Sequence, residues 1–282
     1  MTRRDMKKHC IPQYLFIGMA AFLFMACSQE EETEREYEPV PLKVLINQSQ
    51  STDTRATLSG LSTEFEAGDT IGIFVENEDY TQYYNVPYVF DGSNWNLASG
   101  EYTPKRVSFL SNYHYYAYYP YTKSLPGWPY YNDSDEDGTC TADDFFENVI
   151  DGWTPRADQS TKANFDASDL MVGEGTILSA TTGTVSFTLN HKMGLVRITI
   201  IDSNDGPIDD ISGYYSPDLF PASGNPYIPY NNGKYFYSIV PPGREVPFFF
   251  DGSRRPDDNP EEEITAADAG HVTDIFFTNY RF

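Results

Sequence analysis

Cysteine and basic residues are both scarce in this chain. Of its 282 residues only three are cysteines, namely Cys10, Cys27 and Cys140, and two of these lie within the first thirty positions. We therefore expect no disulfide framework, so the fold must be held by packing. Lysine and arginine number 19 against 42 acidic residues, a formal net charge of −23. A nucleic-acid binder needs a basic face, so the charge argues against that class of partner.

Catalytic motifs and long amphipathic helical patterns are also missing. The sequence contains no HExxH, Walker loop, GxSxG or GxGxxG pattern, and those spacings are the usual signs of metal, nucleotide and acyl-transfer sites. Aromatic residues are plentiful instead, with 22 tyrosines and 19 phenylalanines. Such residues favour β-strands and supply a core. We expect an all-β protein that is not an enzyme and has no resident cofactor.

Residues 1–26 have the pattern of an export signal. A basic start is followed by an uncharged, mostly apolar run of 13 residues at 14–26. That run is too short for a membrane-spanning helix, which needs about 20 residues, but it suits the core of a signal peptide. Ala26 before Cys27 resembles a bacterial lipoprotein leader, which implies cleavage before Cys27 and its acylation. The alternative is an ordinary secretory leader with an incidental cysteine.

An acidic segment follows at 27–40. The stretch "SQEEE" after Cys27 resembles the short signal that sends some lipoproteins of Gram-negative gut and oral anaerobes to the outer face of the outer membrane. A charged run is also what a solvated tether needs, so both interpretations stay open. Several acyl chains, at about 0.8 kcal/mol per buried methylene, would hold the chain stably at the membrane.

Short alternating segments separated by turn residues fill the rest of the chain. In "PLKVLIN" (41–47), Leu42, Val44 and Ile46 share one side, which predicts a strand. One short helix is predicted at 141–150, capped by Thr141. Many short strands with Gly, Pro and Asn turns are typical of β-sandwiches. Further strands are predicted at 71–75, 112–121, 234–240, 246–250 and 272–278, with two strands and an Asp-Gly turn at 85–100 and two strands at 183–202.

Four segments of the chain form a recognisable set: "FEAGDTIGIFV" (65–75), "YYAYYPY" (115–121), "ASDLMVGEG" (167–175) and "VSFTLNHKMGLVRITI" (185–200). Together they resemble the fimbrillin family, the subunits of type V fimbriae and their surface-lipoprotein relatives. The resemblance implies two tandem transthyretin-like Greek-key β-sandwich domains, at 41–202 and 203–282, of which the second is short. It implies a shaft, tip or anchor subunit of a surface fimbria at the outer membrane, with other fimbrial subunits as partners and a role in adhesion.

The resemblance also implies how such a subunit assembles. A trypsin-like protease would cut after an arginine near the start and free the first strand. Arg55 in "TDTRAT" occupies the matching place, and the freed strand would carry Leu42, Val44 and Ile46. A neighbouring subunit could then fill the vacated groove by β-augmentation. The alternative is that Arg55 is an exposed loop arginine.

The acidic loop "DSDEDGTCTADD" (133–144) matches the spacing of a calcium loop. Asp133, Asp135 and Asp137 stand at positions 1, 3 and 5, a glycine stands at 6, and Asp144 at 12. Calcium takes six to eight oxygen ligands, which such a loop can supply. Asp144 is shorter than the usual glutamate. The alternative is a solvated acidic loop.

The aromatic residues suggest a second function. Trp95, Trp128 and Trp153, with the tyrosine-rich strand, could form a platform for sugar stacking, although sandwich cores use aromatics equally well. The alternative to a fimbrial subunit is therefore a monomeric glycan-binding surface lipoprotein. A host molecule or a glycan would be its ligand.

Overall fold

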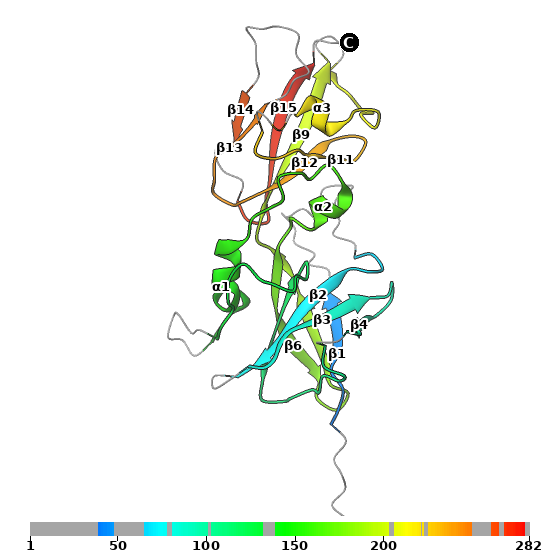
Figure 1. Cartoon of the computed structure of the whole chain (residues 1–282), viewed down its shortest axis with the longest axis vertical. Helices are drawn as coiled ribbons and strands as arrows, with labels where there is room; N and C mark the ends of the chain where they lie inside the picture. The colour runs from blue at the N-terminus through cyan, green and yellow to red at the C-terminus, as the bar shows by residue number, and fades with distance from the viewer. Residues whose placement is uncertain are drawn as a thin grey trace, which may run out of the picture. The chain divides into compact units, whose positions relative to one another are not determined.

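The computed structural model describes residues 39–47, 65–77, 81–100, 103–131, 139–202, 206–220, 222, 225–249, 261–264 and 268–279. Strands dominate these residues (Figure 1) and form three sheets. The prediction of an all-β protein is confirmed at that level. Within the same residues, no helix has both the length and the apolar character needed to cross a membrane.

The first sheet contains eight strands in the order β5-β2-β3-β4-β1-β7-β6-β8, and β5 also pairs with β6. Because β5 pairs with both β2 and β6, the sheet closes on itself. Its core is one cluster of buried side chains from most of these strands. The bounds are β1 (Lys43–Asn47), β2 (Thr70–Glu76), β3 (Thr81–Phe90), β4 (Trp95–Leu97), β5 (His114–Tyr119), β6 (Met171–Ser179), β7 (Thr184–Thr188) and β8 (Asn190–His191).

The second sheet follows β8 directly. It has the order β10-β9-β12-β11, and β15 pairs with β9 in parallel. A separate hairpin joins β13 and β14, and α3 (Ser216–Leu219) precedes β11. The strand bounds are β9 (Gly194–Asp202), β10 (Gly206–Pro207), β11 (Tyr230–Asn231), β12 (Phe236–Val240), β13 (Val246–Phe249), β14 (Glu261–Ile264) and β15 (Val272–Asn279).

The change of sheet falls before β9. The predicted domains meet between residues 202 and 203, at the end of β9, which would put this strand with the first domain. In the structure β9 pairs with β10, β12 and β15 of the second sheet. The physical reason is that Val196, Ile198 and Ile200 bury their side chains in the core of that sheet.

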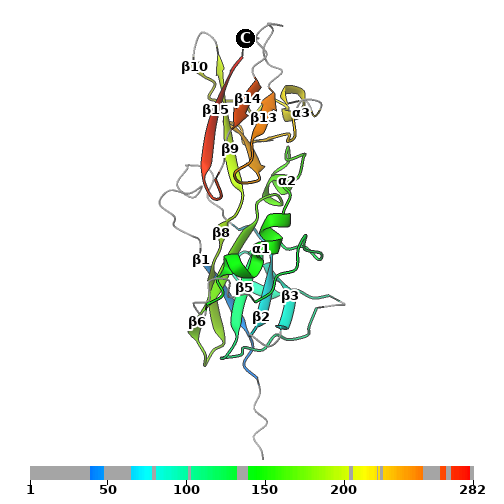
Figure 2. The ribbon, with the colours of Figure 1, turned by 90° about the vertical axis from the view of Figure 1, so that its left-hand side faces the viewer.

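The aromatic strand β5 serves two cores at once. Tyr115 and Tyr119 point into the core of the closed sheet, whereas Tyr116 and Tyr118 pack under α1 (Ala142–Gly152) on the opposite face. Figure 2 shows α1 over this sheet. Successive side chains of a strand alternate between its faces, so a strand buried on both faces needs residues that can be buried at successive positions. This accounts for the run of tyrosines.

Helix α1 confirms the predicted helix and extends it slightly. Thr141 is its N-cap, and the Thr141 and Asp144 side chains each accept a hydrogen bond from the other residue's backbone N–H. This capping box satisfies two N–H groups that the helix itself cannot. Phe145 and Phe146 are buried on the sheet side.

A buried glutamine ties the segment after α1 to the second sheet. The Gln159 amide donates to the Ile239 carbonyl at 2.8 Å and accepts from the Ile239 N–H at 2.7 Å. Gln159 is fully buried. Its side chain thus pairs with β12 as the backbone of another strand would. The short helix α2 (Lys162–Asp166) follows.

Candidate functional site: the first strand and its groove

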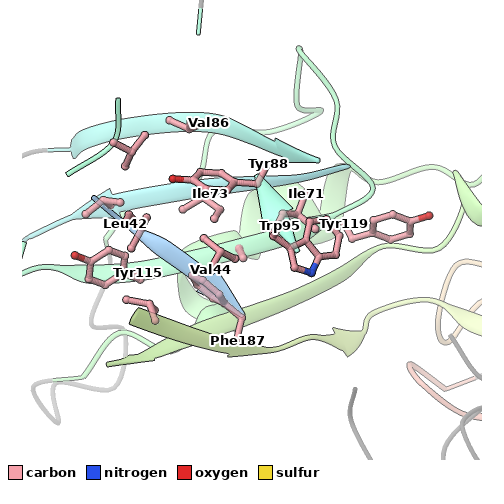
Figure 3. Close-up of a cluster of buried hydrophobic side chains, with 14 of the residues drawn as sticks. Leu42, Val44, Ile71, Ile73, Val86, Tyr88, Trp95, Tyr115, Tyr119 and Phe187 are labelled. Carbon is pink, nitrogen blue, oxygen red and sulfur yellow. The ribbon is translucent and has the colours of Figure 1, made fainter. Parts of the chain in front are cut away.

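Strand β1 is confirmed and has one buried side and one exposed side. Leu42 and Val44 are 7% and 4% exposed, and Ile46 packs partly buried against the same cluster. Leu45, on the other side, is 46% exposed. Figure 3 shows Leu42 and Val44 pointing into the core near Tyr115 and Phe187. The predicted alternation of 41–47 therefore describes the strand correctly.

β1 lies between β4 and β7 and joins them. It runs parallel to β7 over five registered positions, from Lys43 opposite Thr184 to Asn47 opposite Thr188. On its other side it pairs antiparallel with β4 through Val44 and Trp95. Since β4 and β7 are not neighbours in the strand order, removing β1 would open the closed sheet at this point.

Backbone hydrogen bonds also hold the first residue of β1 and the residue before it. The Leu42 N–H donates to the Val107 carbonyl at 2.9 Å, and the Lys43 N–H donates to the Gly183 carbonyl at 2.8 Å. Gly183 has a φ of +65°, and a Cβ placed there would lie 2.4 Å from the Pro41 carbonyl oxygen. Only glycine allows this turn and this approach at no steric cost. The turn before β7 is therefore shaped around the entering strand.

The energy that holds β1 can be bounded from its buried side chains. A fully buried aliphatic side chain contributes about 1.5–3 kcal/mol, so Leu42 and Val44 together contribute roughly 3–6 kcal/mol. Ile46 and the backbone pairing with β7 add to this. The strand is held firmly, yet by an amount that another strand with similar side chains could match.

The groove under β1 is apolar, and its hydroxyl groups stay neutral. Burial raises the pKa of Tyr115 to about 12, and the same cause raises the pKa of Tyr88. The Tyr115 hydroxyl donates to the Leu110 carbonyl at 2.8 Å and accepts from the Leu110 N–H at 2.7 Å. No charge faces the buried side of β1 from these two rings, so a replacement strand would need apolar side chains at alternate positions.

Most of the other predicted site residues lie outside the described part of the chain. These are Cys27, Arg55, Asp133, Asp135 and Asp137. Asp144 is described, and it lies at position N3 of α1 in the capping box. Among the residues that the structure describes, no group of three or more His, Cys, Asp or Glu side chains is arranged to hold a metal.

The three tryptophans do not form one surface platform. Trp95 is 9% exposed and belongs to the core of the closed sheet. Trp153 is half-buried, and its indole N–H donates to the Ser168 carbonyl at 3.0 Å. Trp128 is 66% exposed. The shared platform is therefore wrong for Trp95 and Trp153, whose side chains the fold uses internally.

Fold and site together define an all-β protein whose first described strand completes a closed sheet. Comparison with known proteins identifies its family, because residues 54–214 match the model of the Fimbrillin-like family. The chain belongs to this family, which confirms the resemblance seen in the sequence. Members are structural proteins, so the expectation that the chain is not an enzyme is also confirmed. No curated protein matches the sequence.

Solved structures share the fold at low sequence identity. A fimbrial protein from Bacteroides ovatus matches with a TM-score of 0.58 and 19% identity, over 84% of this chain and 48% of its own. The chain thus spans about half the length of that protein. A candidate cell adhesion protein from Bacteroides ovatus matches with a TM-score of 0.50 and 17% identity, over 86% of this chain and 93% of its own.

Proposed function

We propose that the chain is a subunit or accessory of a surface fimbria, as shaft, tip or anchor, which assembles by β-strand donation and takes part in adhesion. The observation that carries this is the position of β1. It is a short strand whose Leu42 and Val44 fill the core, and it separates β4 from β7. Its departure would leave an apolar groove with two unpaired edges, and such edges recruit another strand.

Proteolysis after Arg55 would start the exchange. Arg55 lies between β1 and β2 in the sequence, so a cut there severs the covalent link between β1 and the sheet that follows. The neighbouring subunit's strand would then take the place of Leu42, Val44 and Ile46. An anchor subunit would keep β1 and its lipid on Cys27, at the outer membrane. Membership of a fimbrial family and the separate cores of the first and second sheets support two tandem transthyretin-like domains, and we propose that a leader and an acidic tether precede them.

A disulfide across β1 and β7 tests strand exchange directly. Lys43 and Thr184 are registered neighbours, and adjacent strands lie about 4.8 Å apart, within the Cα range of a disulfide. The chain from residue 28, treated with a trypsin-like protease, should form a ladder of heat-resistant oligomers on gels. The oxidised Lys43→Cys/Thr184→Cys variant should form none, and dithiothreitol should restore the ladder.

Control variants separate the effect of the disulfide from the effect of the substitutions themselves. The single variant Lys43→Cys should form the ladder normally, and Arg55→Ala should block it while Arg35→Ala, in the acidic segment, should not. N-terminal sequencing of assembled material should begin at Ala56. A ladder from the oxidised double variant, or assembled material that still begins before β1, would reject strand exchange at this site.

A monomeric glycan-binding surface lipoprotein is the second candidate function. The observation in its favour is the exposed ring of Trp128, stacked on Tyr84 with the ring centroids 4.6 Å apart. This candidate predicts a protein that stays monomeric after protease treatment and that is retarded in affinity electrophoresis on a glycan gel. The fimbrial function predicts the ladder described above.

The loop at 133–144 is proposed to bind calcium weakly through Asp133, Asp135 and Asp137. The Asp144 carboxylate already accepts hydrogen bonds from the Thr141 N–H and hydroxyl at the start of α1, so its share in a calcium site competes with helix capping. Calorimetry should show heat of binding that Asp135→Asn removes. A flat titration at millimolar calcium would reject the site.

A further inference from the structure

Trp128 presents an indole ring to solvent. It is 66% exposed, whereas Trp95 is 9% exposed. A single exposed apolar residue needs no explanation, but tryptophan is the residue most enriched at the energetic centres of binding surfaces. Whether this ring is built into a site depends on what holds it and what surrounds it.

A chain of aromatic contacts connects the Trp128 ring to the buried core. Trp128 lies nearly parallel to Tyr84, with an interplanar angle of 21°. Tyr84 in turn meets Phe74 edge to face, with the centroids 4.9 Å apart. Phe74 is fully buried and contacts Phe145 and Phe146 of α1. One face of the indole is therefore supported from below, and the other is offered to solvent.

The backbone under the ring is fixed as well. The Asn148 side-chain amide donates to the Trp128 carbonyl at 3.2 Å, and the Tyr130 N–H donates to the Phe145 carbonyl at 3.2 Å. A Cβ on Gly127 would lie 2.2 Å from the Asn148 carbonyl oxygen, so only glycine allows the loop to lie this close to α1. A ring held in this way loses little conformational entropy when it binds a ligand.

A groove with mainly apolar walls and several polar side chains begins on Tyr84. It encloses about 570 Å³, and Ser99, Thr103, Tyr121 and Lys123 contribute to its walls. The side-chain hydroxyls of Ser99, Thr103 and Tyr121 form no hydrogen bond with any residue that the structure describes, and the Lys123 ammonium forms no ion pair there. The groove therefore combines ring surface with hydrogen-bonding groups that no described residue occupies.

We propose that the Trp128–Tyr84 stack and this groove form a binding site for a neutral oligosaccharide. The apolar C–H face of a sugar packs on the negative face of an aromatic ring, and its hydroxyls pair with polar groups such as those in the groove. The net charge of −23 disfavours acidic glycans. The site requires no strand exchange, so it stands independently of the fimbrial function.

The test uses tryptophan fluorescence with neutral hexasaccharides of glucose, xylose, mannose and galactose as probes. Acrylamide quenches exposed indoles, so it should act on Trp128 far more than on Trp95. At least one probe should protect the wild-type chain from quenching. In calorimetry with that probe, Trp128→Ala should weaken the affinity at least about tenfold and Thr103→Val several-fold. Tyr215→Ala, which removes another exposed ring (64% exposed), should leave it unchanged.

Three results would overturn the site. One is that none of the probes protects the chain at 10 mM. Another is unchanged affinity in Trp128→Ala. The third is loss of the protease-dependent ladder in Trp128→Ala without glycan binding by the wild type, which would make the ring a protein contact. An unchanged unfolding midpoint shows that the variant is folded. Glycan binding by a chain that forms no ladder would leave this site standing and reject the fimbrial function alone.

Discussion

Two leucines three positions apart, Leu42 immediately before β1 and Leu45 within it, allow a matched test of what this segment does. Leu42 is 7% exposed and lies in the core of the closed sheet, and Leu45 is 46% exposed on the opposite side. The substitutions Leu42→Ala and Leu45→Ala remove the same atoms from the same segment. Any difference between them therefore reports the burial of the segment rather than its composition.

The expected sizes follow from the two environments. Truncating a buried leucine to alanine costs about 2–5 kcal/mol, since the cavity left behind adds to the lost transfer free energy. An exposed substitution usually stays within about 0.5 kcal/mol. Ile46, which is half-buried, should give an intermediate loss on truncation to alanine.

Urea unfolding of the chain from residue 28, followed by circular dichroism, measures both free energies of unfolding. Susceptibility of β1 to release gives a second measurement. After cleavage behind Arg55, Leu42→Ala should lose the N-terminal fragment on gel filtration faster than the wild type, and Leu45→Ala should not. Equal unfolding free energies for the two variants, or equal release, would refute the conclusion that β1 completes this core.

Three further changes probe the supports around this strand and the second sheet. Gln159→Leu removes both hydrogen bonds to Ile239 and leaves buried backbone groups unpaired, so chemical denaturation should show a loss of about 2–5 kcal/mol. Gly183→Ala must adopt a positive φ and approach Pro41 too closely, so we expect a loss of about 1–3 kcal/mol and faster release of the cleaved first strand. Burial raises the pKa of Glu76 above its ordinary 4.5. The contribution of Glu76 to stability is therefore present at low pH and is lost as pH rises from about 4.5 through the raised pKa. Glu76→Gln should remove that part of the pH dependence of stability in urea titrations between pH 4 and 7.

Each of these changes has a matched control. Gln82 is exposed, so Gln82→Leu should change stability little. Gly213 has open space around it, so Gly213→Ala should be tolerated. For Glu76 the control is Glu147→Gln on the exposed side of α1. If a control matched its test variant, the burial or geometry assigned to the test residue would be wrong.

Local patterns in the sequence predict local structure well here. The alternation of Leu42, Val44 and Ile46 predicts β1, and Thr141 with the phenylalanines that follow predicts α1, because both signals depend on neighbouring residues only. The two-sided burial of β5 cannot be predicted in this way. Its tyrosines look alike in sequence, and their division between two cores depends on α1 packing over the strand.

Features that depend on residues far apart in the chain are harder to predict from sequence for the same reason. The place of β9 in the second sheet depends on its partners β12 and β15, which follow it in the chain. The pairing of Gln159 with Ile239 joins residues 80 positions apart, and no local signal marks it. Trp128 shows that the exposure of a candidate site residue is also hard to predict from sequence. The loop that carries it packs against α1 through the close approach of Gly127 to Asn148, which sequence alone does not indicate.

The geometry of β1 explains why a cut would matter more than the strength of the strand. Before cleavage, β1 is tethered to β2 through residues 48–69, and a tether of this kind returns a detached strand at an effective concentration in the millimolar range. The roughly 3–6 kcal/mol from Leu42 and Val44 corresponds to about 10²–10⁴ in an equilibrium constant. After cleavage behind Arg55 only the strand's own contacts hold it, and a detached strand is diluted away. A donor strand with one or two more buried side chains would then replace β1 in the cleaved subunit but not in the uncut one.

Mixing the intact chain with a peptide of residues 41–47 should therefore give no exchange. Mixing the cleaved chain with the same peptide should give measurable exchange within hours. Equal exchange in the two would mean that the covalent link does not protect the groove.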